Sequence, residues 1–280
     1  MSLLTNVSKV KSLPLLNVVS PAVDYVPEKE VMANYYRCQS LALEAAKAVE
    51  KLLHPDWTEK KAAATMEVYL KDSGVRSFFH KPFAWFGDRT RFVGVKNYRG
   101  FLPTNRKLGE NAAYILDVAP ILNGYVADIG HSGFYGESEA FNKAADFLQS
   151  FQKKIPDLFN ANKPIGNEIW QTIDRDIVES GYSNIHKLYP LGVLGHRVHK
   201  INEAMPRLGV LRFGWQSYWS LLSRGGFGQI INQNFVGDLK GLWAIEPHIG
   251  GEGFGLKFEE ILVFDGKKAR WLKEDYQAGL

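Results

Sequence analysis

The amino-acid sequence predicts an α+β fold made of two related halves. Two stretches with helical periodicity are followed by strand-like runs, and the same order then recurs farther along the chain. No polar linker separates the two repeats. We therefore expect the halves to pack as one domain instead of folding independently.

The helices are predicted from apolar residues at helical spacing and from residues typical of helix ends. The first ends before Pro55, because proline disfavours a helical conformation in the residue that precedes it. The second begins near Asp56, which forms a capping-box pattern with Glu59. The last ends at Gly181. The predicted helices cover residues 27–53, 56–73, 137–159 and 164–180.

Composition excludes several classes of protein. Of the 280 residues, 45% are hydrophobic and 23% are charged, which argues against a disordered, collagen-like or solenoid chain. The net charge of +4 is mild and the charges are interspersed, so we expect no nucleic-acid partner. No apolar run is long enough for a membrane span or a secretory signal, and the lone Cys38 suggests a reducing compartment. These features together predict a cytoplasmic protein.

The domain organisation follows from where the periodic segments begin. Residues 1–27 are expected to form an N-terminal arm that lies over the domain or over a neighbouring subunit, so that a homodimer is reasonable. Residues 28–280 are expected to form one catalytic-type domain. A stretch rich in glycine and aromatic residues interrupts it at about residues 201–240.

Two aspartates lie in apolar strand-like runs on either side of Asn123-Gly124, the strongest hairpin signal in the chain. With a two-residue loop there, Asp117 faces Gly130 and Asp128 is its diagonal neighbour. Both carboxylates then point to the same face. Two such charges in an apolar sheet need a cation, a shared proton or water, unless they are simply strand-end aspartates in solvent.

Two glutamates occur in comparable surroundings. Glu246 follows an apolar strand and precedes a proline, and Glu259 precedes a run of Ile, Leu, Val and Phe. Either one alone is typical of a surface or edge glutamate, but the four acids together point to a cluster. Their hard oxygen atoms suit Mn²⁺, Mg²⁺, Fe²⁺ or Co²⁺, whereas a structural zinc site would use Cys and His.

These motifs resemble a known family. The segment ILDVAPILNGYVAD is similar to the aspartate hairpin of the pita-bread metallopeptidases, which include methionine aminopeptidase, Xaa-Pro aminopeptidase, prolidase and the non-peptidase creatinase. The family's two aspartates lie eleven residues apart, as they do here. WAIEP resembles its Ile-Glu-Pro segment, and FEEILVF resembles its terminal glutamate strand. The resemblance covers roughly residues 30–275 and implies a pita-bread fold, with two pseudo-symmetric halves around a curved, mostly antiparallel sheet.

The resemblance also implies a metal centre. It assigns one or two divalent ions, drawn from Mn, Fe, Co and Zn, to Asp117, Asp128, Glu246 and Glu259. A water molecule held by the metal would attack a carbonyl group. In this scheme Glu246 or Glu259 moves a proton, and His199 steadies the tetrahedral intermediate.

The histidines depart from the family pattern. The family places a metal-binding histidine seven residues before the substrate-facing one, but the position seven residues before His199 is Gly192. His196 is the alternative ligand, if its loop is remodelled. Another family histidine falls near Arg99 and is absent. His131 is discounted as a donor, because residues three apart on a strand face opposite sides.

The stretch at residues 201–240 is longer than methionine aminopeptidases usually have there. Its aromatic residues either pack on the core or form a lid or wall over the pocket. We expect Trp215 to contact substrate, and Arg99 and Arg212 to anchor an anionic group of the substrate.

Three hypotheses follow about function. The first is a metal-dependent hydrolase of the aminopeptidase or Xaa-Pro peptidase type, which cleaves an amide bond near an N-terminus or in a small molecule. The second is a creatinase-like, non-peptidase enzyme that keeps the fold and the metal. Iron-dependent chemistry on a small molecule is one example of such a reaction. The third is a metal-free binding module on the same fold.

Overall fold

The computed structural model describes residues 26–201 and 229–277. Its α+β architecture confirms the predicted fold class. The helices are α2 (Lys29–Glu50), α3 (Glu59–Asp72), α4 (Glu139–Phe159), α5 (Gly166–Glu179) and the short α7 (Leu272–Gln277). The first four match the predicted helices to within three residues. The second begins differently from the prediction, because Thr58 is its N-cap and accepts a hydrogen bond from the Lys61 N–H.

The described strands form three antiparallel sheets, one in the first half and two in the second half. The first half contains β1 (Ser77–Phe86), β2 (Ala112–Leu122), β3 (Tyr125–Val126) and β4 (Ile129–Tyr135). The second contains β5 (Ser183–Asn184), β6 (Gly195–Arg197), β7 (Ile230–Ile231), β8 (Gly241–Ile245), β9 (His248–Gly250), β10 (Gly255–Lys257), β11 (Glu260–Phe264) and β12 (Ala269–Trp271). All pairings between these strands are antiparallel. The sheet of the first half has β4 and β1 on either side of β2, and those of the second half have the orders β10-β9-β5 and β12-β11-β8-β6-β7.

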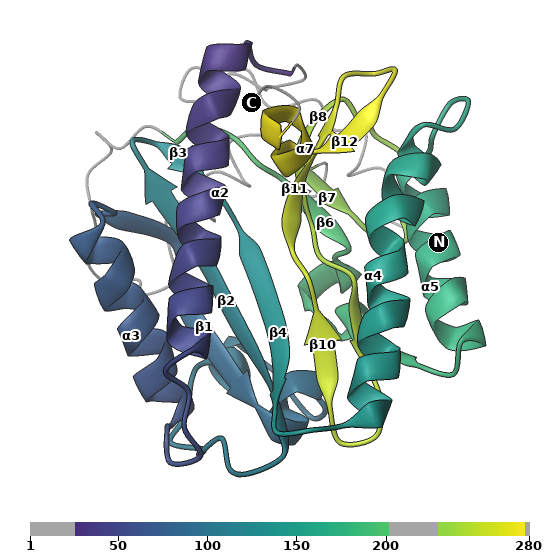
Figure 1. Ribbon diagram of the computed structural model, residues 1–280. Coiled ribbons are helices and arrows are strands. Elements are labelled where there is room, and N and C mark those ends of the chain that lie inside the picture. Colours follow the sequence, from purple (N-terminus) through teal and green to yellow (C-terminus); the bar gives the residue numbers. More distant parts are fainter. Residues whose placement is uncertain (1–25, 202–228, 278–280) are drawn as a thin grey trace.

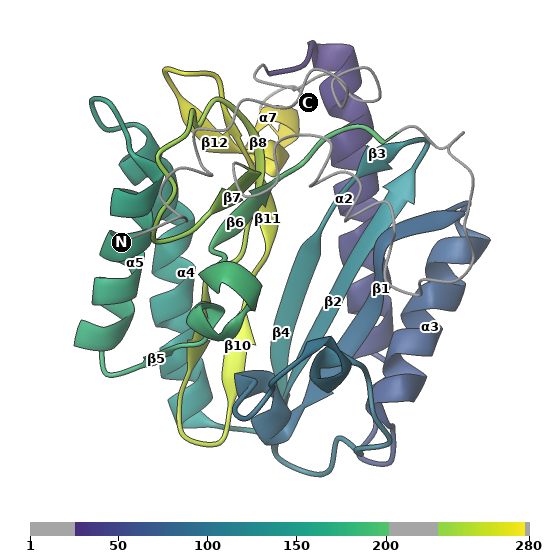
Figure 2. The same ribbon diagram turned by 180° about the vertical axis from the view of Figure 1, so that it is seen from behind.

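Each half has helices on the same side of its strands. Figure 1 shows α2 and α3 beside the strands of the first half, and α4 and α5 beside those of the second. Separate hydrophobic clusters lie under the two helix pairs, and a third cluster, which contains Cys38, joins residues of both halves. The two halves also meet at a bridge between Gly130 and Glu259. The other face of the strands, seen in Figure 2, carries the turns η2 (Gly87–Arg91), η3 (Tyr98–Phe101) and η5 (Pro190–Gly192).

The aspartate hairpin has the predicted register. Ile121 pairs with Val126 across the Asn123-Gly124 turn, and Asp117 pairs with Gly130.

Within the described residues, no helix combines the length and apolar character that a membrane span requires. The predicted N-terminal arm is almost wholly outside the described residues, as is most of the stretch at residues 201–240.

A buried carboxylate fixes the loops that follow β1. Glu59, at the start of α3, is 0% exposed. It accepts hydrogen bonds from the Phe86 N–H, from Arg89 Nε and from both the N–H and the hydroxyl of Thr104. The loops held in this way carry Phe92 and Phe101, which line the cavity described below.

Replacement of Glu59 should destabilise the protein strongly. We expect Glu59→Ala to lower the free energy of unfolding by about 3–5 kcal/mol, because Arg89 loses its buried partner. Urea denaturation measures the effect. The matched control is Asp56→Asn, which removes an exposed ion pair to Lys107 near the same helix end and should leave the urea midpoint unchanged. Equal stability of the two variants would contradict the structural role of Glu59.

Candidate metal centre

Folding brings the four acids predicted from the sequence to one cavity. Asp117 lies in β2, Asp128 lies between β3 and β4, Glu246 follows β8, and Glu259 precedes β11. All four line the same cavity, and they are between 2% and 7% exposed. Four carboxylates are thus buried together at one cavity, which Phe101 of η3 and Pro190 of η5 also line.

A lysine lies among these acids. The ammonium Nζ of Lys257, at the end of β10, is 2.7 Å from Asp117 Oδ2, 2.9 Å from Glu246 Oε2 and 2.8 Å from Glu259 Oε2. Its side chain is 2% exposed. One positive charge therefore compensates part of the charge of three buried carboxylates, and the opposite oxygens of Asp117 and Glu259 remain available.

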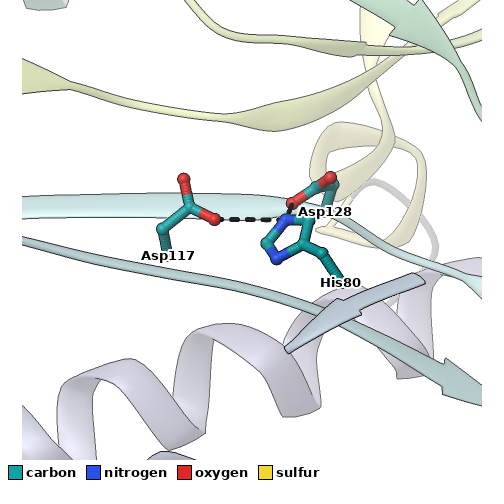
Figure 3. Close-up of side chains that lie close together, drawn as sticks. All are labelled: His80, Asp117 and Asp128. Atoms are coloured by element: carbon teal, nitrogen blue, oxygen red, sulfur yellow. Dashed lines mark hydrogen bonds and ion pairs between the residues drawn. The ribbon is translucent and has the colours of Figure 1, made fainter. Parts of the chain in front are cut away.

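Two histidines contact the remaining oxygens. His196 of β6 places Nε2 3.2 Å from Asp128 Oδ2 and 3.6 Å from Glu259 Oε1. His80 of β1 places Nε2 3.1 Å from Asp128 Oδ1 and 3.2 Å from Asp117 Oδ1 (Figure 3). Asp128 thus lies between two imidazole rings.

Phenylalanines of β1 hold both imidazole rings. His80 stacks on Phe83 with ring centroids 5.0 Å apart, and His196 stacks on Phe79 at 5.4 Å. The register of β1 against β2 is irregular on both sides of His80, between Phe78 and His80 and again between His80 and Phe83. Such bulges re-aim side chains near functional sites, and here His80 contacts Asp117 and Asp128.

The pKa values of the buried acids show that the cluster favours bound protons or other cations. Burial raises the pKa of Asp117 to about 6, although Lys257 and His80 oppose this shift. Burial and repulsion from Glu259 raise the pKa of Glu246 to about 8. Burial alone would also raise the pKa of Asp128, but His80 and His196 outweigh it and hold that pKa below its ordinary value.

Both histidines show the reciprocal effect. Burial lowers the pKa of His80, but the charges of Asp128 and Asp117 outweigh it and raise that pKa to about 10. The pKa of His196 is likewise raised well above its ordinary value by Asp128 and Glu259 against the effect of burial. The centre therefore binds protons strongly, as expected of buried carboxylates that lack sufficient cations.

The donor set fits a divalent cation. His80, Asp117 and Asp128 each offer one ligand atom within 4.8 Å of the others, and Asp128, His196 and Glu259 do the same. Asp117 Oδ1 is buried and accepts no well-formed hydrogen bond from the described residues, although His80 Nε2 is near. Carboxylates and imidazoles suit Mn²⁺, Fe²⁺, Co²⁺ and Zn²⁺.

The cavity beside the centre is lined mainly by aromatic and apolar side chains. Its volume is about 210 Å³. Besides the acids, the two histidines and Lys257, its walls are formed by Phe79, Phe83, Trp85, Phe92, Phe101, Tyr189, Pro190 and Val193. A small apolar group fits these walls better than a charged one.

The remaining sequence predictions have different outcomes. His199 is buried, at 4% exposed, and does not line the cavity. Arg99 lies exposed in η3 and does not line the cavity either. Arg212 and Trp215 lie outside the described residues. The catalytic and substrate-binding roles of these residues stay predictions.

Sequence reasoning missed His80 and Lys257. No family spacing points to His80, which lies far before the position where the family histidine was sought. Lys257 stands two residues before Glu259, so the same-face rule for strands was the signal that could have found it. His131, discounted from the sequence, pairs instead with Glu50 of α2, Nε2 to Oε2 at 3.0 Å.

Fold and centre together define a pita-bread domain with a carboxylate–histidine site. Comparison with family models gives the same result: the model of metallopeptidase family M24 matches residues 33–265, and the chain belongs to this family. Enzymes of this family use divalent metals. No curated protein matches the chain significantly.

Solved structures of peptidases share the fold at low sequence identity. X-Pro aminopeptidase from Thermotoga maritima is 16% identical, with a TM-score of 0.66 over 89% of this chain and 62% of that protein. Prolidase from Pyrococcus furiosus is 19% identical, with a TM-score of 0.65 over 89% and 65%. Aminopeptidase P from E. coli is 13% identical, with a TM-score of 0.59 over 90% and 56%. The chain spans less than two thirds of each of these proteins.

Removal of the Lys257 ammonium should destabilise the fold. We expect Lys257→Met to lower the free energy of unfolding by about 3–5 kcal/mol, because three buried carboxylates lose their shared cation. Urea denaturation with a chelator present measures this change. Lys268→Met, at an exposed position, is the control and should match the wild type. A Lys257→Met protein as stable as the wild type would show that the ammonium is dispensable.

The stability of the metal-free protein should depend on pH. The folded pKa values of Asp117 and Glu246 lie above their ordinary values, so the folded state binds more protons than the unfolded chain. Stability should therefore rise as the pH falls from about 8 to about 6. The urea midpoint at each pH tests this, and Glu246→Gln should flatten the dependence. A midpoint that rises toward higher pH would contradict the expected sign.

Proposed function

We propose that this chain is a divalent-metal-dependent hydrolase of the aminopeptidase or Xaa-Pro peptidase type. It cleaves an amide bond near the N-terminus of a peptide or in a small molecule. One observation carries the proposal: in a chain of metallopeptidase family M24, four buried acids and two histidines meet at the wall of one apolar cavity.

The residues of the centre have separable roles in this proposal. Asp117, Asp128, Glu259 and His196 hold the metal, which when bound polarises a carbonyl group and supplies a nucleophile near neutral pH. Glu246 accepts a hydrogen bond from Lys257 and belongs to neither of the two groups of candidate metal ligands. In this proposal it therefore serves as the proton carrier. Its pKa, raised by burial to about 8, lets it hold a proton near neutral pH.

The cavity indicates which substrate group enters. A volume of about 210 Å³ lies below the range of about 300–1,000 Å³ typical of sites for drug-sized ligands. Among the described residues that line the cavity, Lys257 provides the ammonium group, and three carboxylates already bind it. We therefore assign the cavity to a small apolar side chain or acyl group next to the scissile bond.

Asp128→Asn should separate folding from activity. Asp128 contacts both histidines, so its replacement should lower amide hydrolysis by about 10- to 100-fold while the chain stays folded. Release of the N-terminal residue is measured on Met-peptides, Xaa-Pro peptides and small-molecule amides after loading with Mn²⁺, Co²⁺, Zn²⁺ or Fe²⁺. The control is Asp157→Asn, which changes an exposed acid of α4. Wild-type protein that binds metal but cleaves none of these amides would reject the proposal.

A second candidate function keeps the metal and changes the reaction. Two imidazoles and carboxylates are ligands typical of non-haem iron, and His80 and His196 contact the two oxygens of Asp128. This favours iron-dependent chemistry on a small molecule. Stoichiometric iron after anaerobic loading, together with no amide cleavage, would support this candidate over the first.

A further inference from the structure

We infer that His80 is a metal ligand and that, with Asp117 and Asp128, it forms a second cation position beside the one made by Asp128, His196 and Glu259. The two positions share Asp128. This inference rests on the proposed function only in that both require the centre to bind metal.

The tautomer of His80 is the first step of the argument. Nδ1 lies 2.9 Å from the backbone carbonyl oxygen of Lys81. A carbonyl oxygen accepts and never donates, so Nδ1 carries a hydrogen and donates it. In the neutral ring, Nε2 then presents a lone pair to Asp117 Oδ1 and Asp128 Oδ1. Without a metal, this place is filled by a proton on Nε2, which donates to Asp128 Oδ1; a bound metal ion would replace that proton between the same three side chains.

The distances fit a metal ion in that place. Ligand atoms about 2.0–2.2 Å from one ion stand roughly 2.8–3.6 Å apart, the shorter separations at octahedral angles and the longer ones at tetrahedral angles. The separations from His80 Nε2 are 3.2 Å to Asp117 Oδ1 and 3.1 Å to Asp128 Oδ1. A hydrogen bond from Nδ1 to a backbone carbonyl is also what metal-binding histidines commonly make, because it fixes the tautomer and the ring orientation.

His196 repeats the arrangement on the other side of Asp128. Its Nδ1 lies 3.3 Å from the backbone carbonyl oxygen of Arg197, and its Nε2 faces Asp128 and Glu259. Each ring also packs against a phenylalanine of β1. Both rings therefore have the same tautomer, a phenylalanine neighbour and carboxylates facing Nε2. We infer the same role, metal binding through Nε2, for both.

Lys257 is compatible with both positions. It binds Oδ2 of Asp117 and Oε2 of Glu259, whereas the histidines face Oδ1 and Oε1 of the same carboxylates. The ammonium thus holds each carboxylate from one side and leaves the other oxygen free to bind a metal. Glu246, which belongs to neither ligand group, completes the contacts of the ammonium.

The test is metal stoichiometry and spectroscopy. The apoprotein is titrated with Co²⁺, and bound metal is counted by mass spectrometry after desalting. We expect two equivalents in the wild type, and one in either His80→Ala or His196→Ala, with a different visible spectrum for the ion that each variant retains. His131→Ala is the matched control, because it removes a histidine of the same sheet that pairs with Glu50, and it should keep both ions.

X-ray absorption on the wild type makes the test independent of any variant's folding. Two ions with two imidazoles give an average of one imidazole for each cobalt. A pair of ions that His80 does not bind gives an average of one half.

Full metal content and an unchanged spectrum in His80→Ala would overturn the inference and leave the proposed function standing. A wild type that binds no Co²⁺, Mn²⁺, Zn²⁺ or Fe²⁺ would overturn both. A metal-loaded wild type without peptidase activity, in which His80→Ala loses one ion, would reject the proposed function alone.

Discussion

The Lys257 ammonium joins three carboxylates that come from separate parts of the chain, and two of the three belong to the second half of the fold. Buried charges of one sign repel each other strongly where water is excluded, so folding needs a cation or bound protons where they meet. Lysine supplies that cation from within the chain. It therefore links the two halves of the fold at the same point where the candidate ligands converge.

The backbone around Lys257 is adapted to it. Ser132 of β4 donates a hydrogen bond to the Lys257 carbonyl oxygen and accepts one from the Lys257 N–H, which fixes β10 beside β4. Gly130 makes room for the side chain, since a Cβ there would lie 2.3 Å from Lys257 Cε. Because Gly130 also pairs with Asp117 and bridges to Glu259, one glycine lets the lysine and two of its partners meet. The position of the centre is thus set by strand pairing and by close packing.

The sequence was sufficient to predict features that depend on local periodicity. The turn at Asn123-Gly124 determined the register that places Asp117 opposite Gly130, and helical spacing located the four long helices. His80 was beyond this reasoning. The irregular pairing on both sides of it means that alternation along β1 does not give the face of its side chain. Its contacts with Asp117 and Asp128 depend on the tertiary pairing of β1 with β2, which local spacing does not encode.

His196 shows how pairing between strands can bring an imidazole to the carboxylates where the family spacing has none. The family register points to Gly192, which lies in η5 before β6 begins. His196 lies in β6, four residues after Gly192. It pairs with Ala244 of β8, which stands two residues before Glu246. This pairing carries the imidazole to Asp128 and Glu259 even though its position in the sequence differs. The surroundings of the acids in this centre therefore depend on where the paired strands place their side chains as well as on spacing along the sequence.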